Sequence, residues 1–92
     1  MEPRIMTLHP EGKEGVNISK EKYELVRQAI VGSLEDSGEL TFSELGSKVS
    51  SRLEGNFQGS ISWYFTTVKL DLEARNVIER NGKSPQRLGL VV

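Results

Sequence analysis

The sequence predicts a small, mainly helical α+β domain. Three segments repeat apolar residues at the three- and four-residue spacing of amphipathic helices, and two short β-prone stretches follow on either side of Asn81-Gly82. Asn-Gly is a strong hairpin signal, because both central residues of a type I′ turn need a positive φ angle. A length of 92 residues suits one domain with one core.

The composition limits the classes of function. The chain has 12 basic and 13 acidic residues and a net charge of -1, so overall charge does not indicate a general nucleic-acid binder. The absence of cysteine excludes disulfides, thiolate catalysis and sulfur-rich zinc sites. Neither a signal peptide nor a membrane span is indicated, because the apolar runs are only a few residues long. We therefore expect a soluble cytoplasmic protein.

Residues 1–18 are expected to form a flexible N-terminal arm that precedes a domain of residues 19–92. The helix-breaking residues of this segment are Pro3, Pro10, Gly12 and Gly15. With few apolar side chains, such a segment either stays mobile or lays a short extended stretch over an exposed groove.

The first helix is predicted from about residue 20 to 36. Ser19 is a favourable N-cap, and Gly38 can adopt the left-handed conformation that ends many helices. The apolar face consists of Tyr23, Val26, Ile30 and Leu34, widened by Leu25 and Ala29.

The second helix starts after a capping box formed by Thr41-Phe42-Ser43-Glu44. Leu40, just before it, leaves room for a very short strand. The expected buried side consists of Phe42, Leu45, Val49 and Leu53, and the helix stops at Gly55 and Asn56.

The third helix is predicted from Ser60, its N-cap, to roughly Asn76. Its core side consists of Ile61, Tyr64, Phe65, Val68 and Leu72. At about 100° per residue, a second apolar side contains Trp63, Leu70 and Ala74, which leaves a narrow polar strip of Ser62, Thr66, Lys69 and Glu73. Something must cover that second side.

A β-hairpin closes the chain. Val77 and Ile78 begin the first strand, and Leu88, Leu90 and Val92 alternate on the return. Pro85 cannot donate to a ladder, so the returning strand either lies at an edge or begins after it.

This order of elements predicts a winged helix-turn-helix, in which three helices enclose the core and the hairpin forms the wing. The competing architecture is a three-helix bundle with a disordered tail. The β-prone residues around Asn81-Gly82 favour the wing over the tail.

Several stretches resemble a small bacterial family of unknown function that has a winged-helix-like fold. These stretches are Gly12-Lys13, Tyr23, Leu40-Thr41-Phe42, Gly59-Ser60-Ile61-Ser62-Trp63-Tyr64, Val68-Lys69-Leu70-Asp71-Leu72-Glu73-Ala74-Arg75, Ile78-Glu79-Arg80 and Ser84-Pro85-Gln86-Arg87-Leu88. The resemblance covers nearly the whole chain and implies a single-domain bacterial protein. It transfers no catalytic or ligand-binding residue.

No enzyme chemistry is indicated, and no cofactor or metal site is expected. The stretch from Gly59 to Trp63 begins like a nucleophile elbow but lacks the closing glycine. Gly12-Lys13 lacks the first glycine of a phosphate loop and the Ser or Thr that follows its lysine. His9 is the single histidine and has no base or metal partner that the sequence reveals, so we interpret it as a surface residue.

Duplex DNA is the first expected partner, with the third helix in the major groove and the wing against the backbone or the minor groove. The candidate contact residues are Ser62, Thr66, Lys69, Arg80, Lys83 and Arg87. Asp71 and Glu73 would repel phosphate unless they accept hydrogen bonds from cytosine amines or pair with Arg75. A solvated helix face beside a basic hairpin would give the same pattern.

A protein partner or a second copy of the chain is the alternative, with Trp63, Leu70 and Ala74 as the apolar anchor. That side can also be covered within the chain, by Ile5, Met6 and Leu8 of the arm or by the wing. No small-molecule substrate or membrane partner is indicated.

Overall fold

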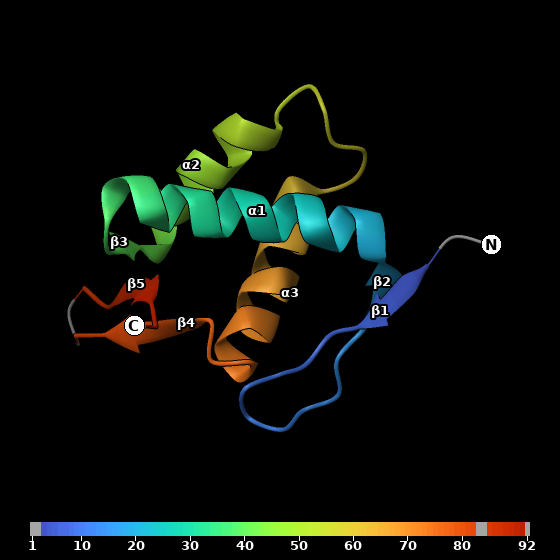
Figure 1. Ribbon diagram of the computed structural model, residues 1–92, viewed down its shortest axis with the longest axis horizontal. Coiled ribbons are helices and arrows are strands. Elements are labelled where there is room, and N and C mark those ends of the chain that lie inside the picture. Colours follow the sequence, from blue (N-terminus) through green and yellow to red (C-terminus); the bar gives the residue numbers. More distant parts are fainter. Residues whose placement is uncertain (1–2, 83–84, 92) are drawn as a thin grey trace.

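The computed structural model describes residues 3–82 and 85–91. In chain order, its elements are β1 (Arg4–Met6), β2 (Asn17–Ser19), α1 (Lys20–Ser37), β3 (Leu40–Thr41), α2 (Phe42–Leu53), α3 (Ile61–Ala74), β4 (Ile78–Asn81) and β5 (Arg87–Leu90). Helix α1 crosses both other helices, and the two small sheets lie near its opposite ends (Figure 1). The described residues thus confirm a helix-rich α+β fold with three helices.

The C-terminal sheet differs from the expected two-stranded hairpin. Its strand order is β3-β5-β4, so the short strand that includes Leu40 adds to the hairpin and β5 lies in the middle. Asn81 is itself part of β4 and pairs with Arg87, so the expected two-residue turn at Asn81-Gly82 is wrong. Strand β5 begins after Pro85, which has no N–H to donate. Val92, expected on the returning strand, lies outside the described residues.

A second sheet, which the sequence analysis did not predict, pairs β1 with β2. The strands are antiparallel, with Ile5 opposite Ile18, and the ladder continues where Thr7 N–H donates to Val16 O (2.8 Å). A Cβ at Gly15 would lie 1.7 Å from Thr7 O, so glycine permits this close approach. The expected boundary after residue 18 falls inside β2, and part of the expected arm is therefore paired.

The predicted N-caps are all present. Ser19, Thr41 and Ser60 accept hydrogen bonds from the amides of the first turns of α1, α2 and α3. The capping box is complete, because Glu44 also accepts from Thr41 N–H (2.9 Å). Helix α3 ends at Ala74, two residues before its predicted end, and Asn76 adopts a φ of 62°.

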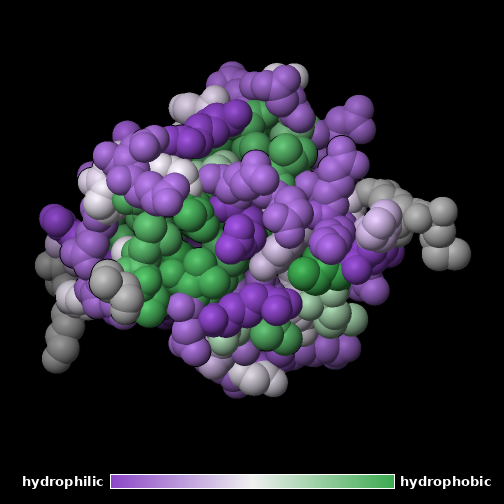
Figure 2. Space-filling model, viewed as in Figure 1, coloured by the Kyte–Doolittle hydropathy of each residue, from purple (hydrophilic) through white to green (hydrophobic). Residues whose placement is uncertain are grey.

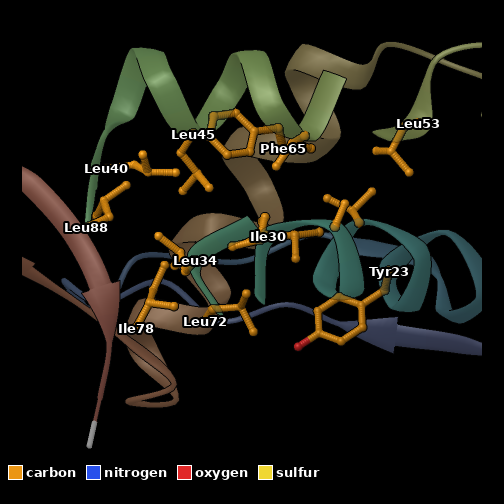
Figure 3. Close-up of a cluster of buried hydrophobic side chains, with 14 of the residues drawn as sticks. Tyr23, Ile30, Leu34, Leu40, Leu45, Leu53, Phe65, Leu72, Ile78 and Leu88 are labelled. Carbon is orange, nitrogen blue, oxygen red and sulfur yellow. The ribbon is translucent and has the colours of Figure 1, made fainter. Parts of the chain in front are cut away.

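The core lies where the three helices meet the C-terminal sheet (Figure 3). Most of the predicted apolar faces are buried there, and Ile30, Leu45 and Leu72 are fully enclosed. Two predictions are wrong: Leu25 is 40% exposed and Phe42 is 47% exposed. Leu25 lies at the edge of the α1 stripe, and Phe42 opens α2, where its ring contacts Phe65 at the surface with a centroid separation of 5.1 Å.

Candidate nucleic-acid interface

A solvent-open hollow of about 280 Å³ lies between α2 and the first half of α3. Its lining residues are Phe42, Ser43, Gly46, Ser50, Ile61, Ser62, Phe65 and Thr66. The four hydroxyl-bearing residues among them are exposed. Gly46 allows the two helices to approach, because a Cβ there would lie 3.2 Å from the Phe65 ring.

Ser62 and Thr66, both predicted contact residues, lie together on one edge of this hollow. Their spacing of four residues places them on one face of α3. Lys69, the next predicted contact, continues that strip but is only 8% exposed. Its Nζ lies 5.3 Å from the centroid of the Phe42 ring and 2.9 Å from Glu73 Oε2. The structure therefore brings the three α3 candidates together and buries one of them.

Arg80 reaches the same cluster from β4. Its Nε donates to Glu73 Oε1, so Lys69 and Arg80 each contact one oxygen of the same carboxylate. Burial alone would raise the pKa of Glu73, but hydrogen bonds from Arg80 and Lys69 outweigh it and hold that pKa below its ordinary value. Two predicted phosphate contacts are thus already paired with an acid.

Arg87 lies apart from this cluster. Arg80 is directly opposite Leu88 in the β4–β5 ladder, so these two side chains share a face of the sheet. Arg87 precedes Leu88 and points to the other face. It is exposed. Lys83, the remaining predicted contact, lies outside the described residues.

The predicted apolar anchor on α3 is partly open. Trp63 is 47% exposed, and its ring meets Tyr64 edge-on at 4.9 Å between centroids. Leu70 and Ala74 are half-buried. Leu8 of the N-terminal segment lines an open hollow together with Ala74. The expected arm therefore lies beside the Ala74 end of this apolar side, while Trp63 at the other end stays exposed.

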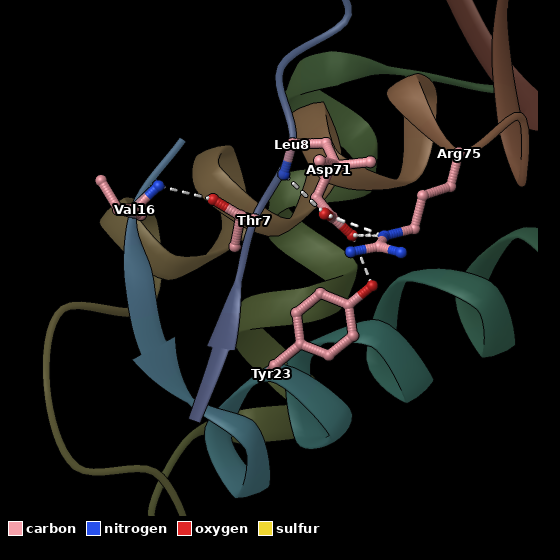
Figure 4. A network of polar contacts seen from close by, with 6 residues as sticks. All are labelled: Thr7, Leu8, Val16, Tyr23, Asp71 and Arg75. Carbon is pink, nitrogen blue, oxygen red and sulfur yellow. Dashed lines mark hydrogen bonds and ion pairs between the residues drawn. The ribbon is translucent and has the colours of Figure 1, made fainter. Parts of the chain in front are cut away.

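A buried polar network joins α1, α3 and the N-terminal segment (Figure 4). At its centre is Asp71, which is 0% exposed. It accepts hydrogen bonds from the Tyr23 hydroxyl, from Leu8 N–H (2.8 Å) and from Arg75 Nε (3.0 Å). Burial and then the bond to Asp71 raise the pKa of Tyr23 to about 12.

Only part of this network has a signal in the sequence. The pairing of Asp71 with Arg75, one of the two alternatives considered for this acid, is present and follows the i, i+4 spacing. Leu8 and Tyr23 are distant from Asp71 in sequence. No local sequence pattern indicates that they contact it. The network links α1, α3 and the N-terminal segment through buried hydrogen bonds.

The surface seen in Figure 2 is mostly hydrophilic, with hydrophobic residues gathered between α1 and the β4–β5 region. Within residues 3–82 and 85–91, no group of three or more histidines or acidic residues is arranged to hold a metal ion. None of the helices described is long and apolar enough to cross a membrane.

These features define a small helix-rich α+β protein with a hydroxyl-lined hollow between two helices. The chain belongs to the Family of unknown function (DUF6958), whose model matches residues 4–88. This match confirms the resemblance to a family without an assigned function. No curated protein and no solved structure matches the chain.

Proposed function

We propose that this protein is a winged-helix module that binds duplex DNA through the hollow between α2 and α3. The winged-helix interpretation is supported by the strand that separates α1 from α2 and joins the C-terminal hairpin in the order β3-β5-β4. In this interpretation α2 and α3 are the helix-turn-helix pair, and β4 with β5 is the wing. We also propose that the protein acts in the bacterial cytoplasm, a compartment in which duplex DNA is accessible.

The observation that carries the DNA proposal is the convergence of four exposed hydroxyls, from Ser43, Ser50, Ser62 and Thr66, on one hollow. Serine and threonine hydroxyls donate to phosphate oxygens and also contact base edges. The exposed Phe42 ring beside them offers apolar contact to a thymine methyl group. The first two turns of α3 therefore carry side chains suited to a DNA groove.

The charges predict how this binding depends on salt. Because Lys69 and Arg80 are paired with Glu73, few cations are available to neutralise phosphates. With about two phosphates neutralised, the logarithm of the binding constant falls with the logarithm of salt concentration with a slope of roughly -2. We therefore expect modest affinity that is best measured at low salt.

The test is a fluorescence-anisotropy titration of a labelled random-sequence duplex at about 50 mM salt. The double variant Ser62→Ala/Thr66→Ala removes two hydroxyls from the hollow and should weaken binding by about tenfold or more, at about 1 kcal/mol per hydrogen bond. Ser47→Ala/Ser51→Ala removes two exposed hydroxyls that line a different hollow and should leave affinity unchanged. Absence of wild-type binding, or equal effects of both variants, would refute the proposal.

A protein interface is the second candidate, and the exposed fraction of Trp63 favours it. Here Trp63, Leu70 and Ala74 would bury against a second copy or another protein. Sedimentation velocity of Trp63→Ala should then show a loss of association, whereas Leu25→Ala, which alters another exposed apolar side chain, should not. Unchanged association together with lowered stability would assign Trp63 to packing alone.

The proposal assigns no catalytic activity to the chain. Ser60, in the stretch that begins like a nucleophile elbow, uses its hydroxyl to cap α3 by accepting from Trp63 N–H (3.1 Å). His9 Nδ1 accepts from Glu11 N–H (3.1 Å). These local bonds give both side chains structural roles.

A further inference from the structure

Glu73 holds two cations that the fold places beside the candidate interface. Its side chain is 6% exposed, and its two oxygens contact Lys69 Nζ and Arg80 Nε. A phosphodiester has the same charge and also presents two anionic oxygens. A DNA phosphate is therefore chemically equivalent to the Glu73 carboxylate as a partner for these two cations.

Lys69 lies at the border of the hollow between α2 and α3. It continues the strip that begins with Ser62 and Thr66, and its ammonium group lies over the ring of Phe42, which lines the hollow. When Glu73 does not hold it, the four-carbon stem of lysine allows its charge to move to the exposed edge of that ring. The side chain of Arg80, 41% exposed, is similarly close to solvent.

We propose that Glu73 is an internal competitor of the DNA backbone: it binds Lys69 and Arg80 in the free protein, and a phosphate has to displace it. This inference rests on the proposed DNA binding and adds the residue that sets its affinity. Removing the Glu73 charge makes two further cations available to the duplex. Binding by such a variant is tighter at low salt and more sensitive to salt.

Glu79 provides a matched control. It is exposed, it precedes Arg80 in β4, and it lines an open hollow together with Glu73 and Arg80. It forms none of the ion pairs found among the described side chains. Glu79→Gln therefore makes the same change in net charge as Glu73→Gln without releasing a cation.

The experiment measures binding of the random duplex to wild type, Glu73→Gln and Glu79→Gln at about 50 and 200 mM salt. Two additional phosphate contacts make the affinity of Glu73→Gln fall about tenfold more than that of wild type over this range. Glu79→Gln should follow the wild-type salt dependence. Circular dichroism verifies that each variant is folded. If Glu73→Gln does not fold, Glu73→Asp, whose shorter side chain cannot reach both cations equally, replaces it, with Glu79→Asp as the matched control.

The outcomes separate this inference from the proposed function. A salt dependence that is steeper in Glu73→Gln than in both wild type and Glu79→Gln supports the competitor role. Wild-type binding that depends on Ser62 and Thr66, with equal salt dependence in Glu73→Gln and Glu79→Gln, overturns the competitor role and leaves DNA binding intact. No binding by any variant overturns both.

Discussion

Replacing Tyr23 by phenylalanine should lower the free energy of unfolding by about 2 kcal/mol at neutral pH. The Tyr23 side chain is buried, 4% exposed, and its hydroxyl donates to the fully buried Asp71 carboxylate. A hydrogen bond to a charged acceptor contributes about 1.5–3 kcal/mol. Leu8 N–H and Arg75 Nε still donate to Asp71 in the variant, which keeps the expected loss below the upper end of that range.

Burial of Tyr23, together with its hydrogen bond to Asp71, makes stability depend on pH in the alkaline range. Because folding raises the pKa of Tyr23 from 10.0 to about 12, the folded state favours the neutral phenol. This stabilisation is complete below pH 10 and is lost as the pH rises through about 12, and it amounts to about 3 kcal/mol at about 1.4 kcal/mol per pKa unit. Tyr23→Phe should lack this component of the alkaline loss.

Urea unfolding followed by circular dichroism at pH 7 and between pH 9 and 12 measures both effects. Tyr64→Phe is the control, because Tyr64 packs against Phe57 and Trp63 at a distance from Asp71 in the fold. A loss below about 0.5 kcal/mol for Tyr23→Phe, well short of the expected bond strength, would refute the reasoning. An alkaline decline identical to that of wild type would refute it as well.

Three further changes have calculable consequences. Thr41→Ala removes the side chain that caps α2 and should cost about 1 kcal/mol in urea unfolding; a loss no larger than that of an exposed serine variant would contradict this. Gly15→Ala places a Cβ 1.7 Å from the Thr7 carbonyl oxygen, so the loop must open, and hydrogen exchange of the Thr7 amide should accelerate markedly. Because the pKa of Glu73 is held below its ordinary value of 4.5, its stabilisation is present above that pH and is lost as the pH falls below it. Glu73→Gln should therefore show a smaller acid-induced loss than wild type, and an equal loss would disprove the role of this ion pair.

The helices could be predicted because their signals are local. Ser19, Thr41 and Ser60 each lie within three residues of the amide they cap, and apolar spacing marks the buried faces. The pairing of β1 with β2 has no comparable signal. Strands of three residues are too short for alternation to be recognised, and the close contact at Gly15 depends on a residue eight positions away.

The candidate site could be predicted only in part for the same reason. Ser62 and Thr66 follow from the polar strip of α3, which is a property of one helix. The pairing of Arg80 with Glu73 requires the turn after α3 to bring β4 back against the helix. The sequence predicts Lys69 and Arg80 as DNA contacts, whereas in the structure their charges are opposed by the Glu73 carboxylate that lies between them.

Backbone amide chemical-shift mapping by NMR, with the random duplex added to ¹⁵N-labelled protein at low salt, locates the DNA-binding surface residue by residue. If duplex DNA binds in the hollow between α2 and α3, the largest shifts occur at Ser43, Ser50, Ser62 and Thr66. Shifts centred on Trp63 and Leu70, or no shifts at saturating duplex, would contradict it.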